Sequence, residues 1–409
     1  MGDATGLIHD IARRSREASE VIREYIHVTP LEESTTFSKM AEARVLLKYE
    51  NLQKTGAFKA RGALYKVYKI KDEYNGVVAA SAGNHAQGVA YAGRIFNLKT
   101  IIVMPEGASI SKIEATKNYG AEVILAGRVY DETLKVAKKI AEEKGYALIH
   151  AFDDPDIIAG QGTIALELLE QMDDFEAVVA PIGGGGLISG LASVLKTYKR
   201  DISVYGVEPS AAPKTLYSLK EGRPVTIEPK PTIADGLVVK RLGTITFQII
   251  REAVDGVTLV EEDELAHTIY LLLERGKVLA EGAGAAALAA MIHGKIPAVR
   301  NRKSIAVVSG GNIDLTHIYR ITLRGLAKAG RLAKITGFVP DAPGQLKTVL
   351  EVIASHRGNV IGIFHDRTSQ NIPAWSALVS ITVEVPGRDA IKLIIDELRR
   401  SGYEFWLSD

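Results

Sequence analysis

A lysine with small and apolar neighbours, Lys59, is the first residue of the chain whose setting suits covalent chemistry. It stands in the segment TGAFKARGA, residues 55–63, at the expected start of a helix. Burial lowers the pKa of a lysine, and the neutral amine can then attack a carbonyl group to form a Schiff base. An exposed helix lysine without a chemical role also fits this segment, so the segment alone leaves the question open.

Three loops of small residues each follow directly after a short apolar run. They are residues 81–85 (SAGNH), 183–186 (GGGG) and 309–312 (SGGN). If these runs are parallel strands, the loops lie at the carboxyl ends of sheets, where ligands bind in doubly wound folds. Four successive glycines let the backbone approach a ligand closely, and the helix expected behind them offers N–H groups to a phosphate.

The four glycines are also compatible with a plain turn or with a dinucleotide-binding loop. They also fit a strand-to-helix turn, although such a turn needs only one or two glycines. A dinucleotide fingerprint needs a third glycine where Ile188 stands, while Glu208 at the end of the next run keeps a nicotinamide-dependent dehydrogenase open. No GxxxxGK[ST] segment occurs, which excludes a P-loop.

The apolar runs that must position these loops alternate with longer helical stretches. The expected strands are residues 77–81, 100–104, 122–126, 177–181, 203–208 and 304–309. Continuous apolar strands separated by helices indicate parallel sheets that are covered on both faces. After residue 330 or so the predicted order becomes βαββαβ, with helices at 344–356 and 388–400, which is typical of a small ferredoxin-like domain.

Composition excludes several classes of partner and site. Lys and Arg number 50 against 49 Asp and Glu, so the net charge of +1 favours neither nucleic acid nor an acidic membrane surface as a partner. The absence of cysteine excludes disulfides, thiolate zinc sites and cysteine nucleophiles. No apolar run reaches the roughly 18 residues of a membrane span, and no signal peptide is visible, so we expect a cytoplasmic protein.

A lysine, a phosphate cradle and small polar side chains are together the parts that hold pyridoxal 5'-phosphate (PLP). In these parts the sequence resembles the fold-type II PLP enzymes, and most closely the threonine and serine ammonia-lyases. The motifs run in family order between residues 30 and 325: TGAFKARGA (55–63), SAGNHAQG (81–88), AGQGT (159–163), GGGGL (183–187), ADGL (234–237), EGAGAAAL (281–288) and SGGNID (309–314). The tail, with FVPDAPGQL at 338–346, resembles an ACT regulatory domain.

The resemblance implies an α/β fold with a two-domain, tryptophan synthase beta-like core of parallel sheets and a C-terminal ferredoxin-like (ACT) α+β domain. The expected domains are a large PLP-binding domain (1–46 and 151–329), a small catalytic domain (47–150) and an ACT-like domain (330–409). It also implies a homodimer or homotetramer. An amino-acid effector at the tail, such as isoleucine or valine, and a tail that only mediates assembly are both open.

Carried onto this sequence, the resemblance makes Lys59 the residue that binds PLP covalently and later removes the Cα proton of the substrate. Ser309 is expected at the pyridine nitrogen, where a hydroxyl leaves the nitrogen unprotonated and favours β-elimination over transamination. The other expected cofactor contacts are Phe58, Asn84, Gly183, Gly184, Gly185, Gly186, Leu187, Gly236 and Glu281, with a structural N-cap role left open for Glu281. The expected contacts of the substrate are Ser81, Asn84 and His85.

The implied reaction converts L-threonine to 2-oxobutanoate and ammonia, with L-serine to pyruvate as a secondary activity. The sequence does not rank the two substrates, nor does it separate isoleucine biosynthesis from a catabolic role. Related serine racemases use a second serine where this chain has Ala82, so racemisation is the less favoured alternative within the family. A catalytically silent amino-acid sensor that binds ligand through residues 331–409 is the rival from another class.

The resemblance also bears on metal binding. Some relatives bind a divalent cation through a Glu and an Asp six residues apart. Here Glu208 is present, but Lys214 occupies the position of the Asp, so we expect no metal. Whether the Lys214 ammonium replaces the charge of that cation is left open.

Overall fold

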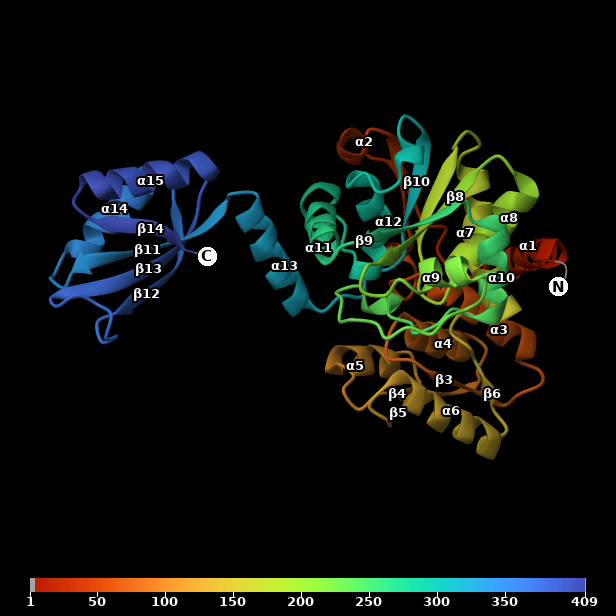
Figure 1. Ribbon diagram of the computed structural model, residues 1–409. Helices are drawn as coiled ribbons and strands as arrows, with labels where there is room; N and C mark the ends of the chain where they lie inside the picture. Colours follow the sequence, from red (N-terminus) through yellow and green to blue (C-terminus); the bar gives the residue numbers. More distant parts are fainter. Residues whose placement is uncertain (1–3, 409) are drawn as a thin grey trace. The chain divides into compact units, whose positions relative to one another are not determined.

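Two compact units, divided between Asp314 and Leu315, make up the chain. The computed structural model describes residues 4–408. The first unit holds two parallel sheets, and the second holds one antiparallel sheet (Figure 1). The expected boundary near residue 330 lies at the other end of helix α13 (Leu315–Lys328), which contacts the strands of the second unit.

The larger sheet of the first unit has six strands in the order β1-β2-β10-β7-β8-β9, and all of them except β1 run parallel. These strands are β1 (Leu31–Glu33), β2 (Arg44–Tyr49), β7 (Ala177–Pro181), β8 (Ser203–Pro209), β9 (Gly256–Val260) and β10 (Lys303–Val308). One face packs against α1 (Ala4–Ile22), α7 (Pro155–Gln171), α8 (Gly186–Tyr198) and α10 (Thr244–Ala253). Helix α12 (Gly282–Ile292) covers β7 to β10 from the other side (Figure 1).

The smaller sheet has four parallel strands in the order β5-β4-β3-β6. They are β3 (Gly76–Ala80), β4 (Lys99–Met104), β5 (Glu122–Leu125) and β6 (Ala147–Leu148). Side chains alternate between the two faces of a strand, so Val77 and Ala79 pack with α4 (Asn84–Ile95), whereas Val78 and Ala80 pack with α6 (Tyr130–Lys144). Helices α3 (Lys59–Ile70) and α5 (Ile110–Asn118) complete this layer.

The structure confirms the six strands that the apolar runs predicted, and it adds four that the sequence did not reveal: β1, β2, β6 and β9. Strand β2 escaped prediction because charged residues interrupt its apolar run. One of them, Lys48, is buried and its ammonium lies 2.6 Å from a Glu167 carboxylate oxygen, which allows a charge inside the sheet. The remaining short elements are α2 (Thr35–Ala41), η1 (Glu50–Leu52), α9 (Lys214–Glu221), η2 (Asp235–Leu237), α11 (Glu262–Leu271), η3 (Leu272–Gly276) and η4 (Pro297–Val299).

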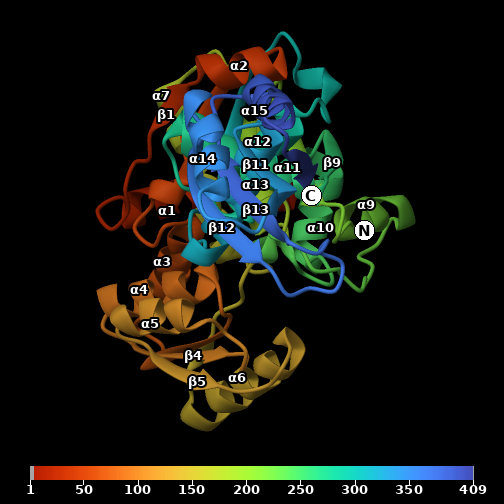
Figure 2. The ribbon, with the colours of Figure 1, turned by 90° about the vertical axis from the view of Figure 1, so that its left-hand side faces the viewer.

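The second unit has the predicted βαββαβ order and a ferredoxin-like antiparallel sheet, β12-β13-β11-β14. Its elements are β11 (Leu332–Pro340), α14 (Gln345–Ser355), β12 (Asn359–Asp366), β13 (Ser376–Glu384), α15 (Arg388–Arg400) and β14 (Glu404–Ser408). Every second residue of β13 is buried, because α14 and α15 lie together over one face of the sheet (Figure 2). In residues 4–408, no helix combines the length and the apolar character needed to cross a membrane.

Candidate active site

Lys59 is the first residue of α3, and its amino group is held by the protein backbone. Nζ donates a hydrogen bond of 2.7 Å to the carbonyl oxygen of Ala151 and lies 5.3 Å from the centroid of the Phe58 ring. Burial disfavours the ammonium form and lowers the pKa of Lys59 to about 8, although the Glu281 carboxylate raises it. An amine with this pKa is partly neutral near pH 7 and can act as a nucleophile or a base.

Arg61, two residues after Lys59, anchors the start of α3. Its guanidinium has no exposed surface and makes two bidentate ion pairs. One pair is with Glu50 of η1 at 2.8 Å for both contacts, and the other is with Glu167 of α7 at 2.6 and 2.9 Å. Bidentate pairs fix orientation as well as distance, so Arg61 holds the helix that presents Lys59.

The glycine loop, residues 183–186, joins β7 to α8 and has no room for side chains. A Cβ on Gly184 would lie 2.1 Å from the Phe152 ring, and Gly185 has a φ of +96°, a conformation that favours glycine. Thr246 Oγ1 donates a hydrogen bond of 2.8 Å to the carbonyl oxygen of Gly184. The backbone N–H groups of the loop therefore continue into the first turn of α8. This arrangement is suited to binding a phosphate group.

Residues 151–153 connect Lys59 to the glycine loop, a role that the sequence did not predict. The carbonyl oxygen of Ala151 accepts the hydrogen bond from Lys59, and Phe152 packs against Gly184 and Gly186. The carboxylate of Asp153 accepts hydrogen bonds from three backbone N–H groups at the start of α10. Because neighbouring residues make these contacts, the lysine and the loop lie in the same region of the first unit.

Asn84 begins α4, and both ends of its side-chain amide are engaged. Nδ2 donates to Oε1 of Glu281 at 2.6 Å, and Oδ1 accepts from Nδ2 of Asn312 at 2.8 Å. Asn312 lies in the SGGNID motif, but nothing in that motif pointed to a role for its side chain. Hydrogen bonds thus join the first residue of α4, the N-cap residue of α12 and the loop after β10.

Glu281 is buried at the N-cap position of α12, yet its side chain makes no capping hydrogen bond. The open alternative of a structural capping carboxylate is therefore not what the geometry shows. Burial, together with the negative charge of Asp235, raises the pKa of Glu281 to about 8. The group is largely neutral at pH 7 and can then donate as well as accept a hydrogen bond.

Ser309 lies at the carboxyl end of a strand of the larger sheet, and Gly236 lies in η2. Ser309 directly follows β10 and is buried, and its hydroxyl donates a hydrogen bond of 3.3 Å to the carbonyl oxygen of Ala283. Its own carbonyl oxygen accepts from the N–H of Phe58 at 3.1 Å. The carbonyl oxygen of Gly236 would lie 3.0 Å from a Cβ on Gly183, so η2 borders the glycine loop.

The predicted substrate loop follows β3 at the carboxyl end of the smaller sheet. Ser81 Oγ accepts a hydrogen bond of 3.1 Å from the N–H of Gly83. The buried ring of His85 lies with Nε2 3.1 Å from the carbonyl oxygen of Ile149, and burial lowers the pKa of His85 to about 3. This neutral ring positions the loop, while the N-terminus of α4 offers N–H groups to a carboxylate.

For Leu187 we expect a contact with the cofactor phosphate through the backbone N–H and not through the side chain. Leu187 is buried in α8 and packs into the core of the larger sheet. Only its backbone N–H, at the start of the helix, is available to a ligand at the glycine loop.

The two residues considered for a cation, Glu208 and Lys214, form an ion pair with each other. Lys214 Nζ lies 2.8 Å from Oε1 of Glu208, and neither side chain has exposed surface. Within residues 4–408, no group of three or more His, Asp and Glu is arranged to hold a metal ion.

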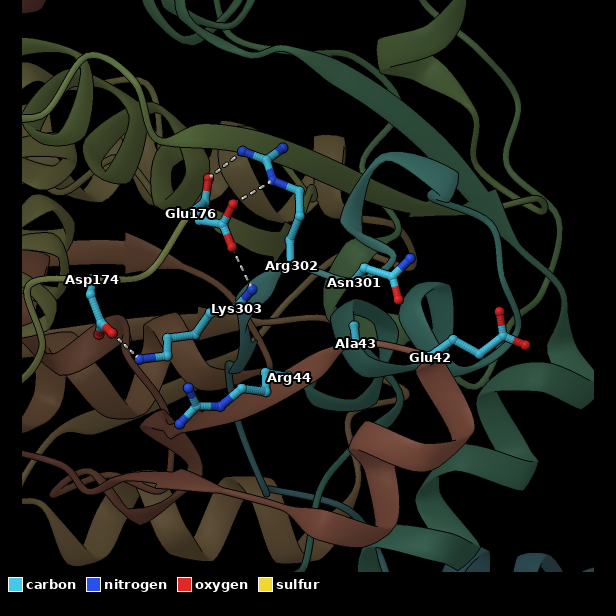
Figure 3. Close-up of a pocket in the computed structure, with 8 residues that line it drawn as sticks. All are labelled: Glu42, Ala43, Arg44, Asp174, Glu176, Asn301, Arg302 and Lys303. Carbon is cyan, nitrogen blue, oxygen red and sulfur yellow. Dashed lines mark hydrogen bonds and ion pairs between the residues drawn. The ribbon is translucent and has the colours of Figure 1, made fainter.

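A hollow of about 480 Å³ lies at the amino ends of β2 and β10, away from the site (Figure 3). Two ion pairs lie among its lining residues: Arg302 with Glu176 at 3.4 Å, and Lys303 with Asp174. The predicted residues follow the carboxyl ends of the strands, so this hollow takes no part in the candidate site.

Comparisons with known proteins point to one family. The family profile described as "Pyridoxal-phosphate dependent enzyme" matches residues 22–311. The L-threonine ammonia-lyase of Thermotoga maritima is 44% identical over 391 residues, which cover 95% of this chain and 97% of that protein. A solved threonine deaminase from T.th. is 44% identical with a TM-score of 0.69, covering 74% of this chain and 98% of its own. The serine racemase of Dictyostelium discoideum is 38% identical with a TM-score of 0.70, covering 74% and 98%.

Proposed function

This chain belongs to the pyridoxal-phosphate dependent enzymes, and we propose that it is an ammonia-lyase that converts L-threonine to 2-oxobutanoate and ammonia. L-Serine, which would give pyruvate, is the proposed secondary substrate. The observation that carries the proposal is the placement of Lys59, whose amine contacts the segment that packs against the glycine loop. The similarity to two threonine-degrading enzymes at 44% identity supports the choice of substrate.

The site fits this cofactor on two structural grounds. Gly184 and Gly185 have no room for a Cβ, so the backbone itself can contact a phosphate group. Lys59 supplies an amine whose pKa of about 8 suits reaction with an aldehyde. We propose that the remaining cofactor contacts are those predicted from the sequence: Phe58, Asn84, Gly183, Gly186, Leu187, Gly236, Glu281 and Ser309.

Bound PLP supplies an electron-withdrawing system conjugated to the substrate nitrogen, which makes the Cα–H bond acidic. Lys59 Nζ is the base that takes this proton, because it is partly neutral near pH 7 and its position is fixed by Ala151. As the Cα proton goes to Lys59, the β-hydroxyl leaves with the C–O bond electrons, and it takes up a proton from the Lys59 ammonium to depart as water. The released enamine then takes up water and gives the 2-oxo acid and ammonia.

Ser309 and Glu281 set the charge around the reacting groups. The Ser309 hydroxyl is neutral, so it offers a hydrogen bond without the full charge that a carboxylate would bring. Glu281 is held by Asn84 and is largely protonated at pH 7. At pH 7, neither Ser309 nor Glu281 therefore brings a full negative charge close to the anionic carboxylate of an amino-acid substrate.

Elimination is favoured over racemisation by a residue that is missing a functional group. Racemisation has to be considered because the chain is 38% identical to a solved serine racemase. Racemisation needs a second group that delivers a proton to the opposite face of Cα. Ala82, in the substrate loop, has a methyl side chain that cannot do this.

We propose that the second unit regulates the enzyme by binding an amino-acid effector such as isoleucine or valine. Its βαββαβ topology supports this role, and it lies outside the residues that the family profile matches, 22–311. A tail that serves assembly alone is the competing proposal. From the sequence resemblance we also propose a homodimer or homotetramer and a place in isoleucine biosynthesis. The proposed cytoplasmic location follows from the hydropathy of the sequence.

A direct test uses purified protein incubated with PLP and dialysed. We expect a visible absorbance band of lysine-bound cofactor, and formation of 2-oxobutanoate when L-threonine is added. A protein that stays colourless after incubation with PLP would overturn the cofactor assignment. A coloured protein that forms no 2-oxo acid from threonine or serine would overturn the lyase assignment alone, and reduction of a nicotinamide cofactor by substrate would favour the dehydrogenase.

A further inference from the structure

An ion pair between Glu208 and Lys214 lies inside the first unit, where the mechanism above does not use it. Glu208 is near the end of β8, and Lys214 is the first residue of α9. Nζ and Oε1 are 2.8 Å apart, and both side chains have 0% exposed surface. Bringing two charges out of water is costly, so a pair of this kind needs a local reason.

The Glu208 carboxylate accepts several hydrogen bonds from groups other than Lys214. It accepts hydrogen bonds from the N–H of Thr215 at 2.9 and 3.0 Å, from Thr215 Oγ1 at 2.7 Å and from the N–H of Leu216 at 3.2 Å. These donors belong to the first turn of α9. The carboxylate is therefore held in place without Lys214, and the contribution of the lysine must lie in its other contacts.

Lys214 reaches the entrance of the glycine loop. Nζ donates a hydrogen bond of 3.1 Å to the carbonyl oxygen of Ile182, the residue directly before Gly183. The N–H of Ile182 in turn donates to the carbonyl oxygen of Val207 at 2.8 Å. Both polar groups of the Ile182 backbone are thus fixed at the point where β7 becomes the loop.

A loop of four glycines cannot fix its own shape, because glycine restricts its backbone least of all residues. Its shape is imposed by neighbours: Phe152 packs against Gly184, and Thr246 holds the carbonyl oxygen of Gly184. The Lys214 ammonium is the neighbour that holds Ile182, the residue directly before the loop. A cradle that is already in shape binds its anion without an ordering cost.

We propose that Lys214, supported by Glu208, is a positioning residue that presets the glycine loop for the phosphate of PLP. This inference rests on the PLP site proposed above and does not depend on which amino acid is the substrate. The ammonium acts through the carbonyl oxygen of Ile182 and leaves the phosphate to the backbone N–H groups of the loop.

The test is the affinity of the apoprotein for PLP, measured by visible absorbance without any amino acid. Lys214→Met keeps most of the side-chain length but removes the charge and the donors. Glu208→Gln/Lys214→Met also removes the partner charge, so that no unpaired carboxylate is buried. For both variants we expect the Kd for PLP to rise about tenfold or more.

A second readout and a matched control separate positioning from a general loss of structure. Hydrogen exchange at the amides of residues 183–186 in the apoprotein should become faster in both variants. Lys196→Met is the control, because Lys196 also donates to a carboxylate and a carbonyl oxygen, those of Asp255 and Ile202, both at 2.8 Å. It sits on α8 beyond the loop, so its Kd for PLP should stay unchanged.

Two outcomes would overturn the inference. The first is an unchanged Kd for PLP in the double variant, since a rise seen only in Lys214→Met would come from the unpaired Glu208. The second is a rise of similar size in Lys196→Met, which would show a general effect of losing a paired lysine. Because no amino acid is present, failure of threonine turnover would leave either result readable.

Discussion

Lys59 Nζ donates a hydrogen bond of 2.7 Å to the carbonyl oxygen of Ala151, and Phe152, the residue after Ala151, packs against the glycine loop. One short segment thereby links the two groups that a phosphorylated aldehyde must meet at its two ends. Arg61 holds the helix that carries Lys59 through two bidentate ion pairs. The predictions below follow from this arrangement of an amine, a loop and their supports.

Replacing Lys59 by alanine should abolish turnover of L-threonine, with a loss of about a thousandfold or more, because both the nucleophile and the proposed base are removed. Circular dichroism and the thermal midpoint should stay close to those of the parent. Lys54→Ala is the control, since Lys54 is an exposed lysine directly before the TGAFKARGA segment. Normal activity in Lys59→Ala would assign the role to another residue.

The rate at which PLP combines with the apoprotein should depend on pH through the titration of Lys59. The lowered pKa of Lys59, about 8, predicts a rate that rises with pH and levels off above this value, whereas an ordinary lysine would titrate above pH 10 or so. Nα-acetyl-lysine, measured in parallel, corrects for the titration of PLP itself. A midpoint above about pH 10 for the protein would contradict the prediction.

Glu281→Gln should move that midpoint to lower pH. Once Glu281 is ionised, above its own pKa of about 8, its carboxylate raises the pKa of Lys59, so the variant lacks a charge that favours the ammonium in this pH range. The Gln side chain can still accept the hydrogen bond from Asn84, so the geometry of the site is kept. A midpoint that rises in this variant would show that the carboxylate does not act on the lysine by charge.

Gly184→Ala should weaken PLP binding by about tenfold or more. A Cβ at this position would lie 2.1 Å from the Phe152 ring, so either the ring or the loop must move. The measurement is the Kd for PLP from visible absorbance. Gly107→Ala serves as the control because a Cβ there would meet nothing within 4 Å, and an unchanged Kd in Gly184→Ala would show that the loop does not contact the cofactor.

Treatment with a chelator should leave the cofactor absorbance and threonine turnover unchanged within about twofold. The Lys214 ammonium already lies among the oxygen atoms of Glu208 and Ile182, where a hard cation would otherwise find its ligands. The measurement compares dialysis against EDTA with dialysis against buffer. Loss of activity that Mg²⁺ or Ca²⁺ restores would contradict the expectation.

Apolar runs and glycine-rich motifs predicted six strands of the two sheets and the loops after them, because strands and turns depend mainly on residues that are neighbours in the sequence. The apolar run at 177–181 and the glycines that follow it form a strand and a turn wherever the fold places them. Lys59 and Ser309 also stand in short motifs, and their roles toward the cofactor are predictions from those motifs. The structure then shows why glycine is needed at Gly184, namely the Phe152 ring beside it.

What escaped prediction depends on contacts between distant residues. The hydrogen bond of Asn312 to Asn84 spans 228 positions of the chain, and that of Asn84 to Glu281 spans 197. The contact of Lys59 with Ala151 spans 92 and involves a backbone carbonyl, which has no signature in the sequence. A partner of this kind becomes visible only when the packed fold is known.

The proposed regulatory role of the second unit predicts a response to branched-chain amino acids. Adding L-isoleucine or L-valine to the full chain should shift the threonine concentration for half-maximal rate by about twofold or more. A chain of residues 1–314 is the control, and the solved threonine deaminase, which matches 74% of this chain over 98% of its own, supports its ability to fold. This shorter chain should turn over threonine without any response. If the full chain does not respond either, the tail serves assembly, and the shorter chain should then sediment as a smaller oligomer than the parent.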